Sequence, residues 1–170
     1  MAMTVQEVSK LMDTEGLRYF VDPARPVLFF GIGGTHGKYQ ILIILDSEGQ
    51  FLQFRTIQYG ECKKGNPHLP LLLRVLGEVN ARNRFVKYGW DPNDGEVMAY
   101  GDVWLADAKL TQDQFHRMMG NFLPVIDADM RRIAHVVAHG TDPGPQDAAP
   151  ARGGEAGPSP EPAPDGPVVL

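Results

Sequence analysis

The sequence is poor in the features that mark secreted and membrane-spanning proteins. Cys62 is its only cysteine, so no disulfide can form within the chain, as is typical of a reducing compartment. The longest aliphatic run, residues 41–45, is far too short to cross a bilayer. Residues 1–7 lack the basic start and apolar stretch of a signal peptide. These absences predict a soluble, cytoplasmic protein without a membrane partner.

Basic charge is also scarce. The chain of 170 residues has 16 Lys and Arg against 21 Asp and Glu, which gives a net charge of −5. Residues 140–170 carry most of this excess, so the rest of the chain is nearly neutral and has no basic cluster. Proteins that grip nucleic acid neutralise several phosphates with grouped Lys and Arg. We therefore expect no nucleic-acid partner.

Composition divides the chain into two parts. Residues 140–170 are dominated by Gly, Pro and Ala with scattered acids. Such a segment has too little apolar surface to offset the entropy of ordering it, so we predict a disordered acidic tail. Residues 1–139 have the length of a single domain.

Apolar periodicity and turn residues predict the elements of this domain. Capping boxes that begin at Thr4 and Thr111 mark two helix starts, and Pro124 is expected to kink or split the last helix. The order is α-β-β-β-α-β-β-α, with a further short strand near residue 19. This order predicts an α+β fold with an antiparallel sheet. The expected helices span residues 5–16, 69–79 and 112–139, and the expected strands span residues 27–32, 38–45, 50–58, 85–90 and 96–105.

The strand over residues 38–45 is apolar on both faces. Tyr39, Ile41 and Ile43 point to one side, while Leu42 and Ile44 point to the other. A strand that is apolar on both faces is usually covered on both. The few helices of this domain are a sparse cover, and a second copy of the chain is the obvious alternative. We therefore predict a homodimer.

The glycine-rich loop 31–38 is the strongest candidate for a phosphate site. A phosphate-binding loop has four residues between its first glycine and its Gly-Lys pair, and then Ser or Thr. Here five residues separate Gly31 from Gly37, and Tyr39 follows Lys38. A strand also follows, where a helix N-terminus is needed. A flexible hairpin loop is favoured, and a nucleotide- or phosphate-binding enzyme is the alternative.

Other reactive side chains give weaker patterns. His135 and His139 lie one helical turn apart, but Val136 stands where zinc proteases place a glutamate. A solvated helix end explains these histidines better. Cys62 precedes two lysines and is best explained as an exposed, incidental thiol, because His68 is the only nearby base. No catalytic residue, metal or cofactor is therefore expected.

Met98, Tyr100 and Trp104 share one face of the last expected strand with two acidic residues, Glu96 and Asp102. Two interpretations stay open. The three side chains are buried in the core, or they form a partly wet surface that binds a peptide. Aromatic rings offer large contact area and methionine an adaptable shape, which suits varied partners.

Several stretches resemble the YbjN family, a group described as bacterial sensory transduction regulators. The resemblance covers most of residues 4–139 and is best over residues 72–127. It consists of a helix that ends in an Asn-rich turn, a short strand, an Asp-x-x-Asp-Gly turn, a second strand and a helix opened by Leu-Thr. The stretches that carry it are residues 76–83, 85–91, 94–97 and 110–114.

This family is similar in fold to the type III secretion chaperones of the CesT type, whose element order matches the one expected above. Those chaperones are typically dimers that bind extended segments of client proteins. The resemblance therefore implies a non-enzymatic, chaperone-like or regulatory protein that binds peptide segments. The family supplies no catalytic residues to carry over. The long acidic tail and Pro124 depart from its pattern.

Overall fold

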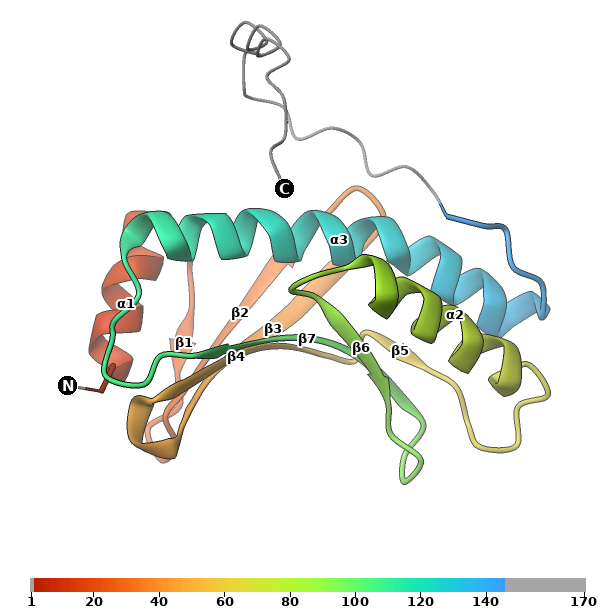
Figure 1. The fold of residues 1–170 in the computed structure, drawn as a ribbon, viewed down its shortest axis with the longest axis horizontal. Coiled ribbons are helices and arrows are strands. Elements are labelled where there is room, and N and C mark those ends of the chain that lie inside the picture. Colours follow the sequence, from red (N-terminus) through yellow and green to blue (C-terminus); the bar gives the residue numbers. More distant parts are fainter. Residues whose placement is uncertain (1, 146–170) are drawn as a thin grey trace, which may run out of the picture.

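The computed structural model describes residues 2–145 of the chain. In these residues one antiparallel sheet carries three helices on the same side (Figure 1). The α+β prediction and its element order are confirmed, with the short strand expected near residue 19 and one more short strand that was not expected. No helix of the described part is long and apolar enough to cross a membrane.

Two of the three helices begin where the capping boxes predict. The Thr4 side chain accepts a hydrogen bond from the Glu7 amide, and the Glu7 carboxylate accepts one from the Thr4 amide. Thr111 and Gln114 repeat this arrangement at the start of the longest helix. That helix ends at His139 and is capped by Gly140, whose φ of +66° lies in the left-handed region that glycine tolerates. The helices are α1 (Val5–Thr14), α2 (Leu69–Arg82) and α3 (Gln112–His139).

The sheet has seven strands in the order β1-β2-β3-β4-β7-β5, and β6 pairs with the other edge of β7. Every pairing between them is antiparallel. A short 3-10 turn, η1 (Ser47–Gly49), joins the third strand to the fourth. The strands are β1 (Phe20–Val21), β2 (Val27–Gly33), β3 (Lys38–Asp46), β4 (Phe51–Ile57), β5 (Gly60–Glu61), β6 (Lys87–Trp90) and β7 (Glu96–Trp104).

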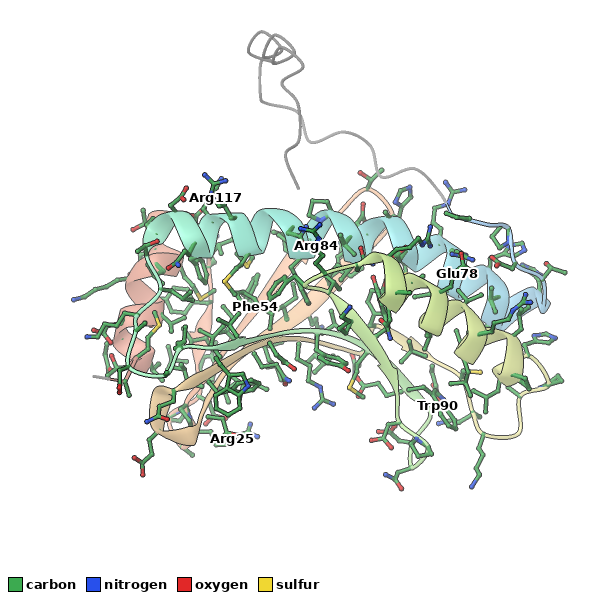
Figure 2. The ribbon with its side chains drawn as sticks, in the orientation of Figure 1. Arg25, Phe54, Glu78, Arg84, Trp90 and Arg117 are labelled. Carbon is green, nitrogen blue, oxygen red and sulfur yellow. The ribbon has the colours of Figure 1, made fainter. Side chains whose placement is uncertain are left out.

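The core lies between the helices and one face of the sheet. Phe54 of β4 points from the sheet towards α3 (Figure 2). Its ring centroid lies 5.9 Å from that of Phe115 and 5.8 Å from that of Phe122, and all three side chains are fully buried. Rings at such distances attract each other in addition to excluding water. This aromatic cluster fixes α3 across the sheet.

Pro124 does not split α3, which continues through it as one helix of 28 residues. The proline faces solvent. The flanking residues Phe122 and Ile126 are fully buried in the core. Tertiary packing on both sides of the proline therefore outweighs the loss of one helical hydrogen bond.

The outer edge of β6 is closed by a side chain. The Asn80 amide of α2 donates to the Tyr88 carbonyl oxygen at 3.0 Å and accepts from the Tyr88 amide at 2.7 Å. A side-chain amide thus satisfies both backbone groups that a neighbouring strand would otherwise bind. Lys87 adds a bond of 2.7 Å from its ammonium group to the Asn80 carbonyl oxygen.

The expected division into a domain of residues 1–139 and a tail of residues 140–170 stays a prediction, because residues 146–170 lie outside the described residues. The first tail residues are described, and they turn back onto the helices. Asp142 binds Arg132 of α3 through two hydrogen bonds. The ordered contacts therefore extend beyond Gly140.

Candidate functional site: the open face of the sheet

The three helices all cover the same face of the sheet and leave the other open (Figure 1). Along each long strand, buried residues alternate with half-buried ones. Tyr39, Ile41 and Ile43 of β3 are buried against the helices, whereas Leu42 and Ile44 are only half-buried. We call the second set of positions the open face. It comprises Phe29, Leu42, Ile44, Phe51, Gln53, Arg55, Met98, Tyr100, Asp102 and Trp104.

Strand register arranges these side chains in rows. Leu42 of β3 pairs with Arg55 of β4, and Arg55 pairs with Tyr100 of β7. Phe51 of β4 pairs with Trp104 of β7 in a second row. Directly opposed side chains on one face of a sheet lie close enough to touch. The face therefore presents aliphatic and aromatic groups side by side across three strands.

Trp104 is the most exposed large apolar side chain of this face. Its exposed fraction is 73%, although its ring centroid lies only 5.0 Å from that of Phe51. Met98 and Tyr100 are half-buried. The interpretation that all three predicted site residues are buried is therefore wrong for Trp104. That these residues bind a peptide stays a prediction.

Polar groups on the open face largely bind one another. Gln53 donates to the Asp102 carboxylate at 2.8 Å. Arg55 approaches the Glu96 carboxylate at 3.5 Å, at the limit of a hydrogen bond, and Glu96 also accepts from the Gln58 amide at 2.9 Å. The face is thus mixed, with hydrogen-bonding groups that can fix the orientation of a bound segment between apolar contacts.

Two predictions made separately from the sequence meet on this one face. The second apolar side of β3, with Leu42 and Ile44, suggested a dimer, and the β7 residues suggested peptide binding. The pairing of β4 with both β3 and β7 joins the two sets into one surface. Sequence reasoning missed Phe51 and Arg55, because no local pattern shows that β7 lies beside β4.

The glycine-rich loop forms the predicted hairpin between β2 and β3. Its amides are already engaged. The Asp127 carboxylate of α3 accepts from the Thr35 amide at 2.8 Å, from the His36 amide at 2.9 Å and from the Tyr39 hydroxyl at 2.6 Å. A Cβ on Gly34 would lie 2.2 Å from that carboxylate, so only glycine fits there. The loop therefore binds an anion supplied by its own chain.

The pKa of Asp127 reflects this arrangement. Partial burial on its own would raise the pKa, but the hydrogen bonds from Tyr39, His36 and Thr35 outweigh it and keep the pKa below the ordinary value. Burial and the Asp127 carboxylate together raise the pKa of Tyr39. Asp127 is consequently charged at neutral pH, and its carboxylate engages the Thr35 and His36 amides of the loop.

Cys62, Asp91 and Asp94 are engaged in packing and turn contacts. Cys62 is buried, and burial raises the pKa of its thiol, so the expectation of an exposed thiol is wrong. Its carbonyl oxygen accepts from the Trp90 indole at 2.7 Å, which holds this segment under the β6–β7 hairpin. Asp91 and Asp94 accept backbone amides two residues further on, as expected of turn residues.

The histidine pair of α3 lies at the end of the helix. The ring centroids of His135 and His139 are 4.6 Å apart, and His135 Nε2 lies 3.0 Å from the Thr141 hydroxyl. Within residues 2–145 there is no group of three or more His, Cys, Asp and Glu side chains placed to hold a metal ion.

Solved structures of similar fold place this architecture among type III secretion chaperone-like folds. The ExsC–ExsE complex matches with a TM-score of 0.51 and 17% identity, over 78% of this chain and 97% of that one. The heterodimeric ExoU–SpcU complex from the type III secretion system of Pseudomonas aeruginosa matches with a TM-score of 0.50 and 14% identity, over 79% and 99%.

The profile of the YbjN family, described as putative bacterial sensory transduction regulators, matches residues 4–134, and the chain belongs to this family. The crystal structure of YbjN from E. coli is similar, with a TM-score of 0.58 and 18% identity over 79% of this chain and 94% of that one. The resemblance predicted from the sequence is confirmed. Among curated proteins, none matches this chain significantly.

Proposed function

We propose that this protein is a non-enzymatic, chaperone-like or regulatory protein of the cytoplasm that binds extended peptide segments of a partner protein. The binding surface is the open face, and Met98, Tyr100 and Trp104 on β7 are its proposed contact residues. The observation that carries the proposal is the 73% exposure of Trp104 beside Phe51 on a sheet face that no described helix covers. Exposed aromatic patches of this kind mark interaction sites.

The fold comparison supports the same proposal. Two solved structures of similar fold, ExsC–ExsE and ExoU–SpcU, are complexes between proteins. An extended segment suits a flat sheet face, because its alternate side chains contact the face while the others point to solvent. The open face of this chain has the breadth of three paired strands, β3, β4 and β7.

A test begins with peptides selected against the full-length protein from a random peptide library. Affinities of the selected peptides are then measured by calorimetry for the wild type, for Trp104→Ala and for Leu73→Ala. Leu73 is a matched control, because it is an exposed apolar residue of α2 on the opposite side of the molecule. We expect Trp104→Ala to weaken binding about thirtyfold, as for an interface hot spot, and Leu73→Ala to change little.

Thermal unfolding of the same variants distinguishes binding from packing. Trp104→Ala is expected to leave the unfolding temperature nearly unchanged, since the side chain is exposed. A loss of about 3–5 kcal/mol, as for a core tryptophan, would contradict the proposed surface. Unchanged affinity of a peptide for the stable variant would equally contradict it.

The alternative function, a nucleotide- or phosphate-binding enzyme that uses loop 31–38, has weaker support. The amides of Thr35 and His36, the natural ligands of a phosphate, are bound to Asp127. A phosphate would have to displace this carboxylate and then occupy a site without a following helix N-terminus. Titration of the wild type with ATP and with inorganic phosphate tests the alternative directly, and saturable binding there would favour it.

In the absence of a partner segment, we propose that a second copy of the chain covers the open face. The half-buried apolar side chains of β2, β3 and β4 support a self-complementary contact. Because the client and the second copy would use the same surface, binding of one excludes the other.

A further inference from the structure

Arg132 of α3 is a fully buried cation whose partners come from outside its own helix. Its exposed fraction is 1%. Its Nε donates to Asp142 Oδ1 at 2.8 Å, and one terminal nitrogen donates to Asp142 Oδ2 at 2.7 Å. The same nitrogen donates to Glu78 Oε2 of α2 at 2.9 Å. The two parallel bonds to Asp142 are the bidentate geometry in which arginine binds a carboxylate most strongly.

Asp142 belongs to a short segment that we call the strap, residues 141–145. It begins after Gly140, whose left-handed conformation turns the chain back at the end of α3. Thr141, Pro143 and Pro145 of the strap are exposed. Apart from the contact of Thr141 with His135, the described contacts of the strap run through the Asp142 carboxylate, which also accepts from the Gly144 amide at 2.9 Å. The strap therefore lacks apolar anchoring.

The surroundings of Arg132 carry charges of both signs. Arg74 of α2 also attracts Asp142. Asp129 of α3 is a second acid that interacts electrostatically with Arg132 and Arg82. Glu78, the third, is about half exposed, and its carboxylate also lies 3.9 Å from Arg82. It faces α3 from α2 (Figure 2). One terminal nitrogen of Arg132 is buried and has no partner among the described residues. Since an unpaired buried charge is costly, Arg132 requires a strong anionic ligand.

We propose that Arg132 and Arg74 form a carboxylate-binding site that Asp142 fills in cis, so that the strap is a releasable cover over this site. Release of the strap exposes Arg132 between α2 and α3, and a carboxylate from an acidic segment of another protein then takes the place of Asp142. The partner chemistry is that of the strap itself, an aspartate within an extended, proline- and glycine-containing segment. This site is separate from the open face.

The first experiment compares the full-length wild type with Asp142→Asn by NMR and amide hydrogen exchange. In the wild type we expect a slowly exchanging Arg132 Nε–H and a protected Gly144 amide. In Asp142→Asn we expect both protections to fall by about tenfold to a hundredfold, the equivalent of losing a charged hydrogen-bond pair. Asp113→Asn is the matched control, because Asp113 pairs with Arg117 on the exposed surface of α3. It should leave both signals unchanged.

The second experiment supplies the missing ligand in trans. The peptide acetyl-Thr-Asp-Pro-Gly-Pro-amide, which copies residues 141–145, is added at millimolar concentration to Asp142→Asn. We expect the Arg132 Nε–H signal to return towards its wild-type position, and the same peptide with Asn in place of Asp to have no effect. The wild type, whose site is filled, should not respond to either peptide.

If the Arg132 Nε–H and the Gly144 amide stay equally protected in Asp142→Asn, Asp142 does not hold the strap in place. If the strap is released but the Arg132 signal does not respond to the peptide, Arg132 does not bind a carboxylate in trans. Either result would overturn the proposal. If Asp142→Asn does not fold, Asp142→Glu keeps the charge on a longer side chain, which moves the carboxylate away from the Gly144 amide that Asp142 accepts from. We expect it to fold with lowered protection of Gly144, and unchanged protection in that variant would also overturn the proposal.

Discussion

Asp127 joins two parts of the chain that lie about ninety residues apart, since its carboxylate binds the amides of Thr35 and His36. The Asp127 side chain is 14% exposed. Its bonds to the Thr35 and His36 amides lie at the surface, whereas its bond to the Tyr39 hydroxyl is partly buried. This single residue holds the β2–β3 hairpin against α3 and fills the loop that most resembles a phosphate site. Its removal would leave the Tyr39 hydroxyl without an acceptor in a partly buried position.

We predict that Asp127→Ala lowers the free energy of unfolding by about 2–3 kcal/mol, because a buried donor left without its charged acceptor is costly. Urea unfolding followed by circular dichroism measures the loss. Asp113→Ala, at an exposed ion pair of α3, is the control and should change stability by less than about 0.5 kcal/mol. Equal stability of the two variants would mean that the hairpin is held by other contacts.

At the scale of single residues, the sequence predicted some roles well and others not at all. Because side chains along a strand point alternately to its two faces, the even-numbered residues Met98, Tyr100 and Trp104 were correctly placed on one face. The turn chemistry of Asp91 and Asp94 was also predictable, since it depends on residues two positions away. The roles of Asp127 and Arg132 were not predictable, because their partners come from other elements and no local pattern marks such contacts.

At the scale of elements, the capping boxes at Thr4 and Thr111 and the turns between strands located the main helices and strands. β5 (Gly60–Glu61) was missed because two residues are too few to show an alternating pattern. Pro124 was expected to kink or split α3 on local chemistry alone, but the buried aromatic and aliphatic residues on either side keep the helix in one piece. Propensity is a weak guide where tertiary packing is this extensive.

The proline nevertheless leaves α3 less stable than it could be. We predict that Pro124→Ala raises the free energy of unfolding by about 1–3 kcal/mol, because alanine restores the helical hydrogen bond that proline cannot donate. Gly120→Ala, one turn earlier, is a parallel variant. Its new Cβ would meet nothing within 4 Å, so a gain of about 1 kcal/mol is expected from helix propensity alone. Thermal unfolding measures both.

A loss of stability in Pro124→Ala, together with the expected gain in Gly120→Ala, would show that the proline ring makes contacts on which α3 depends. A loss in both variants would instead indicate that the solvent-facing side of α3 is covered by a partner.

For the whole molecule, the open face determines the expected state in solution. We predict that light scattering at tens of micromolar, where a standard interface persists, gives about twice the chain mass of 18.7 kDa. Ile44→Arg, on the open face, should restore the monomer, because it places a charge in the contact without a partner. Leu73→Arg on α2 is the control and should leave the dimer intact.

A monomeric wild type would contradict the homodimer and leave the open face to a partner segment alone. A dimer that Leu73→Arg breaks, while Ile44→Arg does not, would place the contact on the helical side. If a selected peptide converts the dimer into a complex of one chain with one peptide, the competition between copy and client for the same face is supported.

The closure of β6 by Asn80 has a consequence for crowded solutions. A sheet grows into a fibre only when it offers a free edge on each side, since every added molecule must present a new edge to the next. Here the Asn80 amide takes the place of a neighbouring strand at Tyr88, so the sheet ends there. An edge-to-edge contact through β1 can therefore join two molecules, while growth at β6 is opposed by the Asn80 side chain. The open face is thus exposed on a sheet whose β6 edge is blocked at Tyr88 against further strands.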